Sequence, residues 1–215
     1  MTSRPAANRR AAPPAPADAP PSPRERILAA AHDLFYRDGI RATGIDAVIA
    51  AAGVTKVTFY RQFPSKNDLV RAFLDHRHDV WMAWFVDALG RHGAREGGGT
   101  APLLGALEEW FSADAYRGCA FLNTVVELGS DLPEVRAIAR RHKADMTEVI
   151  AGLLPAGDAS ALTATPSSGV GNGATGAAEA IATAVDGAIL RAQMDGAPGP
   201  ALAALGRLLA ALDLS

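Results

Sequence analysis

The chain has 215 residues, 49% of them hydrophobic, which is enough to bury a sizeable core in one medium domain or two small ones. No apolar run approaches the roughly 20 residues of a membrane span, and the N-terminus lacks the apolar segment of a secretory signal. The single cysteine excludes an intrachain disulfide, so we expect a cytoplasmic protein with no membrane partner. Few aromatic residues and abundant Ala and Leu at helical spacing predict an all-α fold.

The formal net charge of −2 is unevenly distributed along the chain. Residues 1–23 and residues 24–75 each carry a net charge of +2, whereas residues 76–215 carry −6. This asymmetry favours attraction of nucleic-acid phosphates to the first third of the chain. Differences of this size also arise by chance, so the charge pattern alone does not decide the function.

The first 22 residues are rich in Pro and Ala and contain three arginines. Proline fixes extended geometry and removes backbone donors, so this segment is predicted to be a disordered arm. Such an arm could add phosphate contacts or reach into a minor groove. A solvated tail without a role is equally compatible with the composition.

A first helix is predicted from about Arg24 to Arg37, with Ser22 and Pro23 as its cap and first-turn residue. Asp38-Gly39 ends it, because glycine can leave the helical conformation without steric cost. Its buried stripe is expected to consist of Ile27, Ala31, Leu34 and Phe35.

The segment from Ile45 to Phe63 predicts a helix-turn-helix. Apolar residues of its first part recur at helical spacing: Ile45, Val48, Ile49 and Ala52. Gly53 can adopt the positive φ that ends this helix, and Thr55 can cap a second helix. Phe59 and Phe63 then face the core, and the opposite face exposes cations and donors of the kind that read DNA. Two helices joined at a glycine also occur in proteins that do not bind DNA.

A long helix is predicted from about Ser65 to Arg91, with Ser65 as its cap. At 1.5 Å per residue it spans roughly 37 Å, enough to connect a DNA-reading head rigidly to a second domain. His76 and His78 point about 200° apart on a helix and cannot share one metal ion. No metal site or cofactor is expected, and the charged residues around these histidines are expected to be solvated.

The helix that ends in Asp38-Gly39, Thr43, the turn, and the stretch TFYRQFPSKNDL together resemble the N-terminal domain of the TetR family of transcriptional regulators, over Arg24 to Leu74. The resemblance implies a DNA-binding domain at residues 23–75, with its helix-turn-helix at about residues 44–63. It also implies an effector-binding and dimerisation domain at residues 76–215, and about nine helices in all. The DNA-binding residues that it implies are Thr43, Thr55, Lys56, Val57, Thr58, Tyr60, Arg61 and Lys66.

The resemblance assigns different roles within this set. Contacts to base edges in the major groove are expected from Lys56, Val57 and Thr58. Tyr60 and Lys66 are expected to contact the phosphate backbone, and Arg61 could serve either role. Thr43 is expected to cap the second helix and touch a phosphate, and Thr55 to cap the recognition helix and bind another.

The second part of the chain predicts further helices between loops. Residues 90–102 are expected to form a flexible loop, and residues 155–177 a loose connector, because both are rich in small residues. Helices are expected at residues 100–113 and 133–154, and the Arg-Arg-His-Lys run at residues 140–143 is interpreted as solvated. The stretch Arg117 to Asn123 resembles the RGCxFLN sequence of one TetR-like sub-group, in which it begins a helix lining the effector cavity.

Residues 76–215 are expected to hold a small apolar or amphipathic effector. Candidate ligand-pocket residues are Trp81, Trp84, Phe85, Trp110, Phe111, Cys119, Phe121, Asn123, Thr124, Glu127 and Met146, with His142 as a further polar candidate. Aromatic residues at helical spacing are more often plain core, so each assignment has that alternative.

Two closing helices are predicted at residues 178–194 and 200–213, with apolar faces broader than one partner helix would need. The resemblance implies that this pair meets its copy in a four-helix bundle and makes a homodimer. The expected interface residues are Ile181, Val185, Ile189, Leu202, Leu205, Leu209 and Leu212. A hairpin folded onto its own domain is the alternative.

The predicted function is ligand-responsive, sequence-specific regulation of transcription by a repressor that an effector releases from a palindromic double-stranded DNA operator. No phosphate loop, catalytic triad spacing or dinucleotide glycine pattern is present, so an enzyme is not expected. Two alternatives stay open: a redox-responsive regulator acting through Cys119, for which a buried apolar residue is the simpler interpretation, and a helical interaction module that does not bind DNA. The sequence specifies neither operator nor effector, and it leaves activation open as well as repression.

Overall fold

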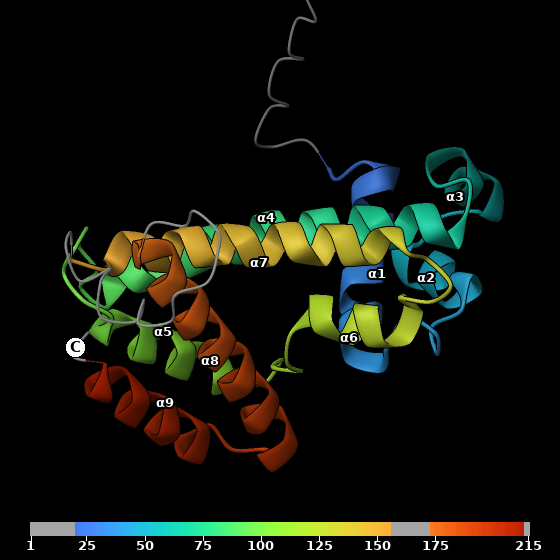
Figure 1. Cartoon of the computed structure of the whole chain (residues 1–215). Helices are drawn as coiled ribbons and strands as arrows, with labels where there is room; N and C mark the ends of the chain where they lie inside the picture. The colour runs from blue at the N-terminus through green and yellow to red at the C-terminus, as the bar shows by residue number, and fades with distance from the viewer. Residues whose placement is uncertain (1–19, 156–172, 213–215) are drawn as a thin grey trace, which may run out of the picture.

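The computed structural model describes residues 20–155 and 173–212, which form nine helices and no strand (Figure 1). In chain order they are α1 (Pro23–Asp38), α2 (Ile45–Ala52), α3 (Lys56–Gln62), α4 (Lys66–Arg91), α5 (Ala101–Phe111), α6 (Ala120–Leu128), α7 (Glu134–Leu153), α8 (Gly173–Asp195) and α9 (Gly199–Ala211). The predicted all-α fold is confirmed. The predicted N-terminal arm, apart from its last three residues, and most of the predicted connector at 155–177 lie outside the described residues. Among the described helices, none is long and apolar enough to cross a membrane.

Side-chain caps explain where three helices begin. The Ser22 hydroxyl accepts a hydrogen bond from the Glu25 amide, and the Glu25 carboxylate accepts one from the Ser22 amide, which is a complete capping box. The Thr55 and Ser65 hydroxyls each accept a hydrogen bond from the backbone amide three residues later. All three caps confirm the predictions made from the sequence.

Helix α2 begins differently from the prediction. Its N-cap is Gly44, and no side chain caps it. Thr43 is buried, and its hydroxyl donates to the Gly39 carbonyl at 2.7 Å. The predicted cap is therefore wrong, because a buried hydroxyl needs a partner and finds it in the preceding turn. Burial also removes this hydroxyl from the surface that a phosphate could reach.

Helices α1, α2 and α3 gather with the first turns of α4 at one end of the molecule (Figure 1). Phe59 and Phe63 are buried there, as predicted. The Arg26 guanidinium donates to the carbonyls of Ala52 and Gly53, at 3.2 and 3.1 Å, and so ties α1 to the turn between α2 and α3. This contact fixes the turn that sets the direction of α3.

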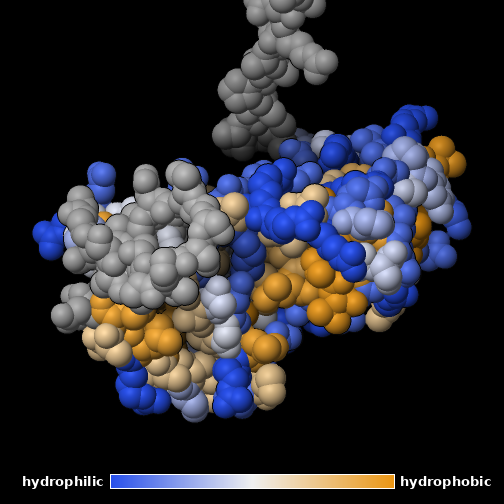
Figure 2. Space-filling view, viewed as in Figure 1, coloured by the Kyte–Doolittle hydropathy of each residue, from blue (hydrophilic) through white to orange (hydrophobic). Residues whose placement is uncertain are grey.

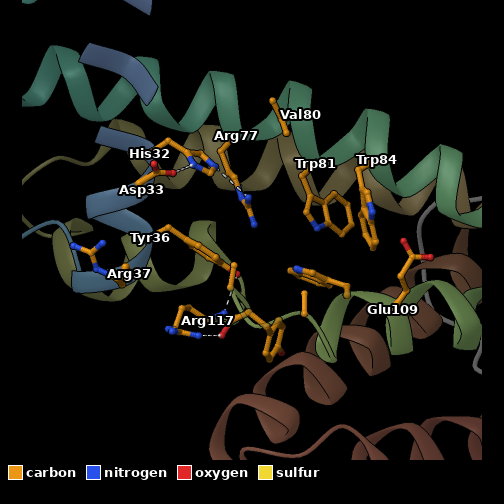
Figure 3. A pocket seen from close by; sticks show the side chains of 14 residues that line it. His32, Asp33, Tyr36, Arg37, Arg77, Val80, Trp81, Trp84, Glu109 and Arg117 are labelled. Atoms are coloured by element: carbon orange, nitrogen blue, oxygen red, sulfur yellow. Dashed lines mark hydrogen bonds and ion pairs between the residues drawn. The ribbon is translucent and has the colours of Figure 1, made fainter. Parts of the chain in front are cut away.

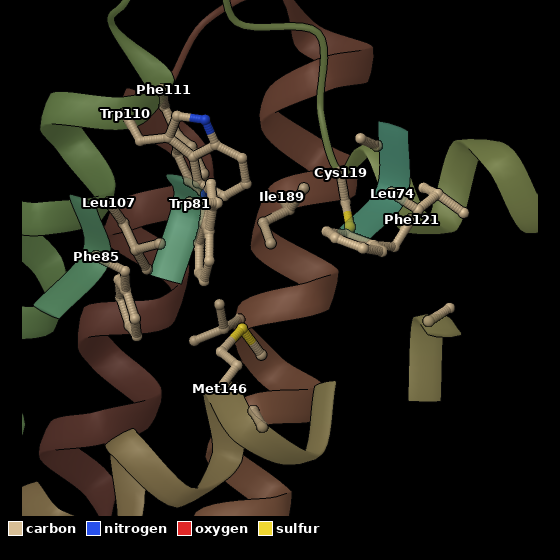
Figure 4. Packing of buried hydrophobic residues seen from close by; sticks show 14 of the residues in the cluster. Leu74, Trp81, Phe85, Leu107, Trp110, Phe111, Cys119, Phe121, Met146 and Ile189 are labelled. Atoms are coloured by element: carbon tan, nitrogen blue, oxygen red, sulfur yellow. The ribbon is translucent and has the colours of Figure 1, made fainter. Parts of the chain in front are cut away.

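The remaining helices pack around α4 and α7, which run side by side along the molecule (Figure 1). Helix α8 packs on α7, and α9 packs on α8 and α5. Figure 4 shows the buried core between them, where Trp81, Phe85, Leu107 and Met146 converge. The buried apolar residues form one continuous cluster with those under α3. The predicted domain division near residue 75 falls within the unbroken α4 and stays a prediction.

The glycine-rich loop after α4 is held by backbone hydrogen bonds that the sequence did not predict. The amides of Gly97 and Gly99 donate to the carbonyls of Gly152 and Leu153, so the segment after α4 is tied to the end of α7. The expectation of a flexible loop did not include this anchor, because the partner carbonyls lie more than fifty residues away in sequence. Helix α8 begins at Gly173, earlier than predicted.

Two charged stretches that were predicted to be solvated contribute side chains to the interior. His142 is buried, its ring lies 3.7 Å from that of Phe121 between centroids, and its Nδ1 lies 3.2 Å from Nδ1 of His78. Arg77 is partly buried, with its guanidinium 4.3 Å above the Tyr36 ring. The prediction was wrong for these two residues, because α7 packs on α4 and α6 around His142 and α4 packs on α1 around Arg77. Arg140 and Arg141 are exposed, as predicted. The described residues contain no group of three or more side chains placed to hold a metal ion.

We predict that Gly53→Ala destabilises the fold more than Gly44→Ala, at the N-cap of α2, where alanine is only a poorer cap. Gly53 has φ +61°, and alanine there costs roughly 1–2 kcal/mol in the left-handed conformation. Gly44 has φ −76°, and a Cβ there would meet no atom within 4 Å. Urea unfolding of both variants measures the difference, and equal free energies of unfolding would contradict this account of the turn.

Candidate nucleic-acid interface and effector cavity

Helix α3 is anchored by one face and exposes the other. Phe59 is fully buried beneath it, and the Tyr60 ring stands edge-on to Phe59 with centroids 5.3 Å apart. Val57 is 72% exposed and Tyr60 42%, and Lys56 and Arg61 are exposed beside them. The outer face therefore offers an ammonium, an apolar group, a phenol and a guanidinium, which are the groups that contact phosphates and base edges.

Contacts around the start of α3 hold some of these groups and leave others free. The hydroxyls of Thr55 and Thr58 lie 2.9 Å apart and bond to each other. The Lys56 ammonium lies 3.5 Å from the Asp46 carboxylate, and both side chains are largely exposed. An exposed pair of this kind contributes little stability. Lys56 can therefore exchange Asp46 for a phosphate or a base edge at little cost.

Lys66 lies apart from this outer face. Its ammonium donates to the carbonyls of Ile40 and Thr43, at 2.6 and 2.7 Å, and so closes the loop between α1 and α2. Burial lowers the pKa of Lys66 below its ordinary value. The ammonium has a third N–H donor beyond these two bonds, so the predicted phosphate contact of Lys66 stays a prediction beside its structural role.

A cavity of about 620 Å³ lies between α1, α4, α5 and the loop after α5 (Figure 3). All three tryptophans of the chain line it: Trp81, Trp84 and Trp110. Tyr116 extends this aromatic wall, and Val80 adds an exposed apolar group. Its size and lining suit a small amphipathic molecule.

Three of the predicted pocket residues, the tryptophans, line this cavity, and the others lie elsewhere. Asn123, Thr124 and Glu127 line a separate pocket of about 400 Å³. Cys119 and Phe121 border a space of about 10 Å³, too small for an effector, and Cys119 is only 3% exposed. The remaining predicted residues are packed in the core: Phe85, Phe111 and Met146. Helical spacing identified apolar faces but could not show which face borders a cavity.

Helix α1 contributes one wall of the cavity, which sequence reasoning missed. His32 and Tyr36 line it, and the Tyr36 hydroxyl donates to the Gly118 carbonyl at 2.9 Å and accepts from the Arg117 amide at 3.0 Å. The helix that supports the helix-turn-helix is thus bonded directly to the segment before α6. No local pattern indicates this, because the partners are about eighty residues apart.

A second link joins the same two regions. The Arg41 amide donates to the Glu127 carboxylate at 2.9 Å, and its guanidinium donates to the Glu127 carbonyl and the Asp131 carboxylate. Glu127 therefore holds the loop after α1 against α6, rather than serving the large cavity.

The Arg117–Asn123 stretch has a local structural explanation. Gly118 has φ +79°, and a Cβ there would collide with the Gln193 amide. The Asn123 side chain donates to the Arg117 carbonyl at 3.0 Å and so closes the turn into α6. Assignment to the sub-group with the RGCxFLN sequence stays a prediction.

Most of the predicted dimer residues are buried within their own chain. Five are at most 3% exposed: Ile181, Val185, Ile189, Leu205 and Leu209; Leu202 and Leu212 are half-buried. The five buried side chains pack α8 and α9 against the rest of the protomer, so their assignment to a partner is corrected. The assignment of Leu202 and Leu212 stays a prediction. The alternative of a hairpin folded onto its own domain therefore describes the inner face of α8 and α9.

The outward side of α8 and α9 is also apolar. Leu190, Met194 and Leu208 are 54%, 67% and 43% exposed. A groove of about 280 Å³ runs between the two helices, and small residues such as Ala184 and Gly187 line it. The two helices therefore expose a second apolar face that their own chain does not cover.

Comparison with known proteins agrees with this architecture. Residues 27–73 match the family model of bacterial regulatory proteins of the tetR family. An uncharacterized HTH-type transcriptional regulator in the lacX 3′ region of Lactococcus lactis is 27% identical over 137 residues, which cover 62% of this chain and 68% of that relative. The HTH-type transcriptional repressor ComR from Escherichia coli is 27% identical over 128 residues, which cover 55% of this chain and 58% of ComR.

Solved structures of other proteins show a similar arrangement of helices. A crystal structure of a TetR-family transcriptional regulator from Streptomyces coelicolor is similar with a TM-score of 0.70 and 26% identity. The match covers 88% of this chain and 95% of that one. The likeness therefore extends from the helix-turn-helix through the helices that surround the cavity.

We predict that His142 makes the protein less stable in mild acid. Burial lowers the pKa of His142 to about 2, so its ring stays neutral in the folded chain, whereas the unfolded chain takes up a proton as pH falls below about 6.5. Acidification from pH 7 to pH 5 should therefore cost about 1–2 kcal/mol through this group.

Urea unfolding at the two pH values measures this loss. His142→Gln should remove most of it, whereas His92→Gln, at a more exposed histidine, should retain it. An equal loss in wild type and His142→Gln would show that other groups dominate.

Proposed function

Because the chain belongs to the TetR family of bacterial regulatory proteins, we propose that it is a homodimeric repressor that leaves a palindromic operator when a small molecule fills the cavity. The chain is a DNA-binding transcription regulator and not an enzyme. The matched parts cover 68% and 58% of the two relatives described above, so these relatives resemble the chain over only part of their length. The operator, the effector and the repressing mode are therefore part of the proposal. The name of ComR, a transcriptional repressor, supports that mode.

The outward face of α3 carries the proposal for DNA binding. Lys56 and Val57 stand at the N-terminal end of α3, where recognition helices contact base edges, and Val57 offers an apolar contact for a thymine methyl. Tyr60 and Arg61 stand one turn later, within reach of a phosphate backbone. Phosphate contacts supply affinity, and the few groove contacts supply sequence choice.

The outward side of α8 and α9 supports a symmetric dimer. Ala184 and Gly187 allow another helix to approach closely, while Leu190, Met194 and Leu208 supply apolar area around them. Two-fold pairing through this face would present two copies of α3. A palindromic operator then requires a spacing of about 34–36 Å between them, one turn of DNA.

The position of the cavity supports coupling between ligand and DNA. His32 and Tyr36 belong to α1, which packs under α2 and α3, while the tryptophans belong to α4 and α5. A ligand between these walls changes the setting of α1 relative to α4. A setting that disfavours the operator spacing releases DNA by population shift.

We predict that Lys56→Ala weakens binding to DNA from the region upstream of the protein's own coding sequence. Loss of one phosphate or groove contact should reduce affinity about tenfold or more and, for a phosphate contact, reduce the salt slope by about 1. Gel-shift titrations at several salt concentrations measure both quantities. Arg95→Ala removes an exposed cation far from α3 and should bind as wild type. Equal affinity of both variants and wild type would contradict the role of α3.

We predict that Leu190→Glu disrupts the dimer and with it the tight binding of DNA. A carboxylate buried in an apolar interface loses its hydration without gaining a partner. Sedimentation analysis should show monomers, with the helical content unchanged.

Val126→Glu provides the control. Val126 belongs to α6 and is 88% exposed. Helix α6 lies away from α8 and α9 in Figure 1, and Figure 2 shows apolar surface in its region. This variant should stay dimeric. A dimeric Leu190→Glu, or a monomeric Val126→Glu, would place the interface elsewhere.

A further inference from the structure

The polar end of the cavity carries a positive charge that no acidic side chain of the described residues neutralises, and we propose that the effector is a flat, apolar organic acid. Its carboxylate binds between Arg77 and Trp81, and its body lies against Trp84 and Trp110. This inference rests on the proposed role of the cavity as the effector site, and it specifies the chemistry of the ligand.

Arg77 is the cation at the centre of the proposal. Its guanidinium lies above the Tyr36 ring, and one of its nitrogens lies 3.2 Å from Nε2 of His32. Within the described part of the chain, no Asp or Glu forms an ion pair with it. A partly buried guanidinium without a carboxylate has lost hydration that the Tyr36 ring replaces only in part. Burial accordingly lowers the pKa of Arg77 below its ordinary value.

The acidic groups that line the cavity are engaged elsewhere. The Asp33 carboxylate bonds to Nδ1 of His32 and is 76% exposed. Glu109 pairs with Arg91 and His92. Neither acid is therefore placed to neutralise the Arg77 guanidinium.

The other two cations of the cavity differ from Arg77. Arg37 pairs with the adjacent Asp38 carboxylate, and the Arg117 guanidinium donates to the carbonyls of Asp114 and Tyr116. Arg37 and Arg117 are both exposed to solvent. Arg77 is thus the cation that an entering anion would meet in the interior.

Trp81 supplies the second donor. It is only 5% exposed, and among the described residues its indole nitrogen has no hydrogen-bond partner. A buried N–H without an acceptor is rare, and its desolvation disfavours the folded state. Arg77 and Trp81 are four residues apart on α4, on one face, and Figure 3 shows both side chains extending into the same space. Within the part of the chain that the structure describes, Arg77 lacks a carboxylate partner and the covered indole N–H of Trp81 lacks any acceptor, so a carboxylate that enters between the two side chains would pair with both.

Aromatic rings form the rest of the wall. The Trp110 ring stands edge-on to Trp81 and to Tyr116, with centroids 5.2 and 5.4 Å apart, and lies 6.3 Å from Trp84. Such rings bind flat apolar bodies by stacking and edge contacts. A neutral molecule could offer an acceptor oxygen but would leave the charge of Arg77 uncompensated, and a cation would be repelled by Arg77.

The same site explains how such a ligand would act on DNA binding. Arg77, from α4, contacts His32 and Tyr36, both from α1. A carboxylate that draws the guanidinium toward itself removes these contacts between α1 and α4. The anion would therefore change the setting of the helix that supports α3.

The test compares acids with their primary amides, which have nearly the same shape but no charge. Isothermal titration calorimetry with 2-naphthoic, biphenyl-4-carboxylic and indole-3-acetic acids and their amides measures the preference. We expect at least one acid to bind tenfold or more tightly than its amide. Fluorescence provides a second readout, because all three tryptophans line the cavity. Absence of any preference for the acid across the panel would overturn the inference.

Substitutions in α4 show which residues cause the preference for acid over amide. Arg77→Gln should abolish this preference. Trp81→Phe, which keeps a ring but removes the N–H, should reduce the preference about two- to fivefold. Arg71→Gln removes a cation of the same helix that pairs with Asp68 and Glu134 away from the cavity, and it should keep the full preference. An undiminished preference in Arg77→Gln would overturn the inference. If Arg77→Gln does not fold, the wild-type panel and Trp81→Phe decide.

Gel shifts with the same ligands separate this inference from the proposed function. Acids that bind with the expected preference but leave the DNA complex intact would support the acid site and contradict the coupling. Release of DNA by amides and acids alike would support the coupling and overturn the acid site.

Discussion

The structure depends on a single constraint: α4 is an unbroken helix whose two ends serve different parts of the molecule. Its first turns are buried in the same core as Phe59 of α3, and its middle carries Trp81 into the core and the cavity wall. Because α4 is continuous, a shift of its middle would also move its first turns, which share the core under α3 with Phe59. This is the physical basis of the proposed coupling between the cavity and α3. Packing of α7 along α4 reinforces this rigidity.

Contacts between α1 and the rest of the chain restrict the position of α1 in the same way. Tyr36 bonds to the backbone at Gly118, Arg41 bonds to Glu127, and Arg77 reaches back from α4 to the rings of α1. These contacts are polar, specific in direction and partly solvated, unlike the apolar core beside them. Polar contacts of this kind are either made or broken over small displacements. They are therefore suited to define two discrete settings of α1 against α4 and the region of α6, which allostery requires.

Much of this architecture was predictable from the sequence, because its signals are local. The caps at Ser22, Thr55 and Ser65 and the turn at Gly53 follow from backbone chemistry within a few residues. The direction in which α8 faces did not follow, because both of its sides carry apolar residues and periodicity cannot choose between them. The burial of His142 and the place of α1 in the cavity wall were missed for a related reason. Each involves a contact across more than sixty residues of sequence, from His142 to His78 and from α1 to the segment before α6, and such contacts leave no periodic trace.

The unpaired donors of the cavity also bear on stability. A guanidinium without a carboxylate and a buried indole N–H without an acceptor both disfavour the folded state, and an apolar replacement of either would remove that cost. These two groups allow the cavity to distinguish anionic ligands from neutral ones. A carboxylate that pairs with both recovers interactions that the empty site lacks. Such a ligand stabilises the setting of α1 and α4 in which both donors reach it, and stabilises the other setting less. Differential stabilisation of this kind is what a ligand needs in order to shift an equilibrium between two conformations.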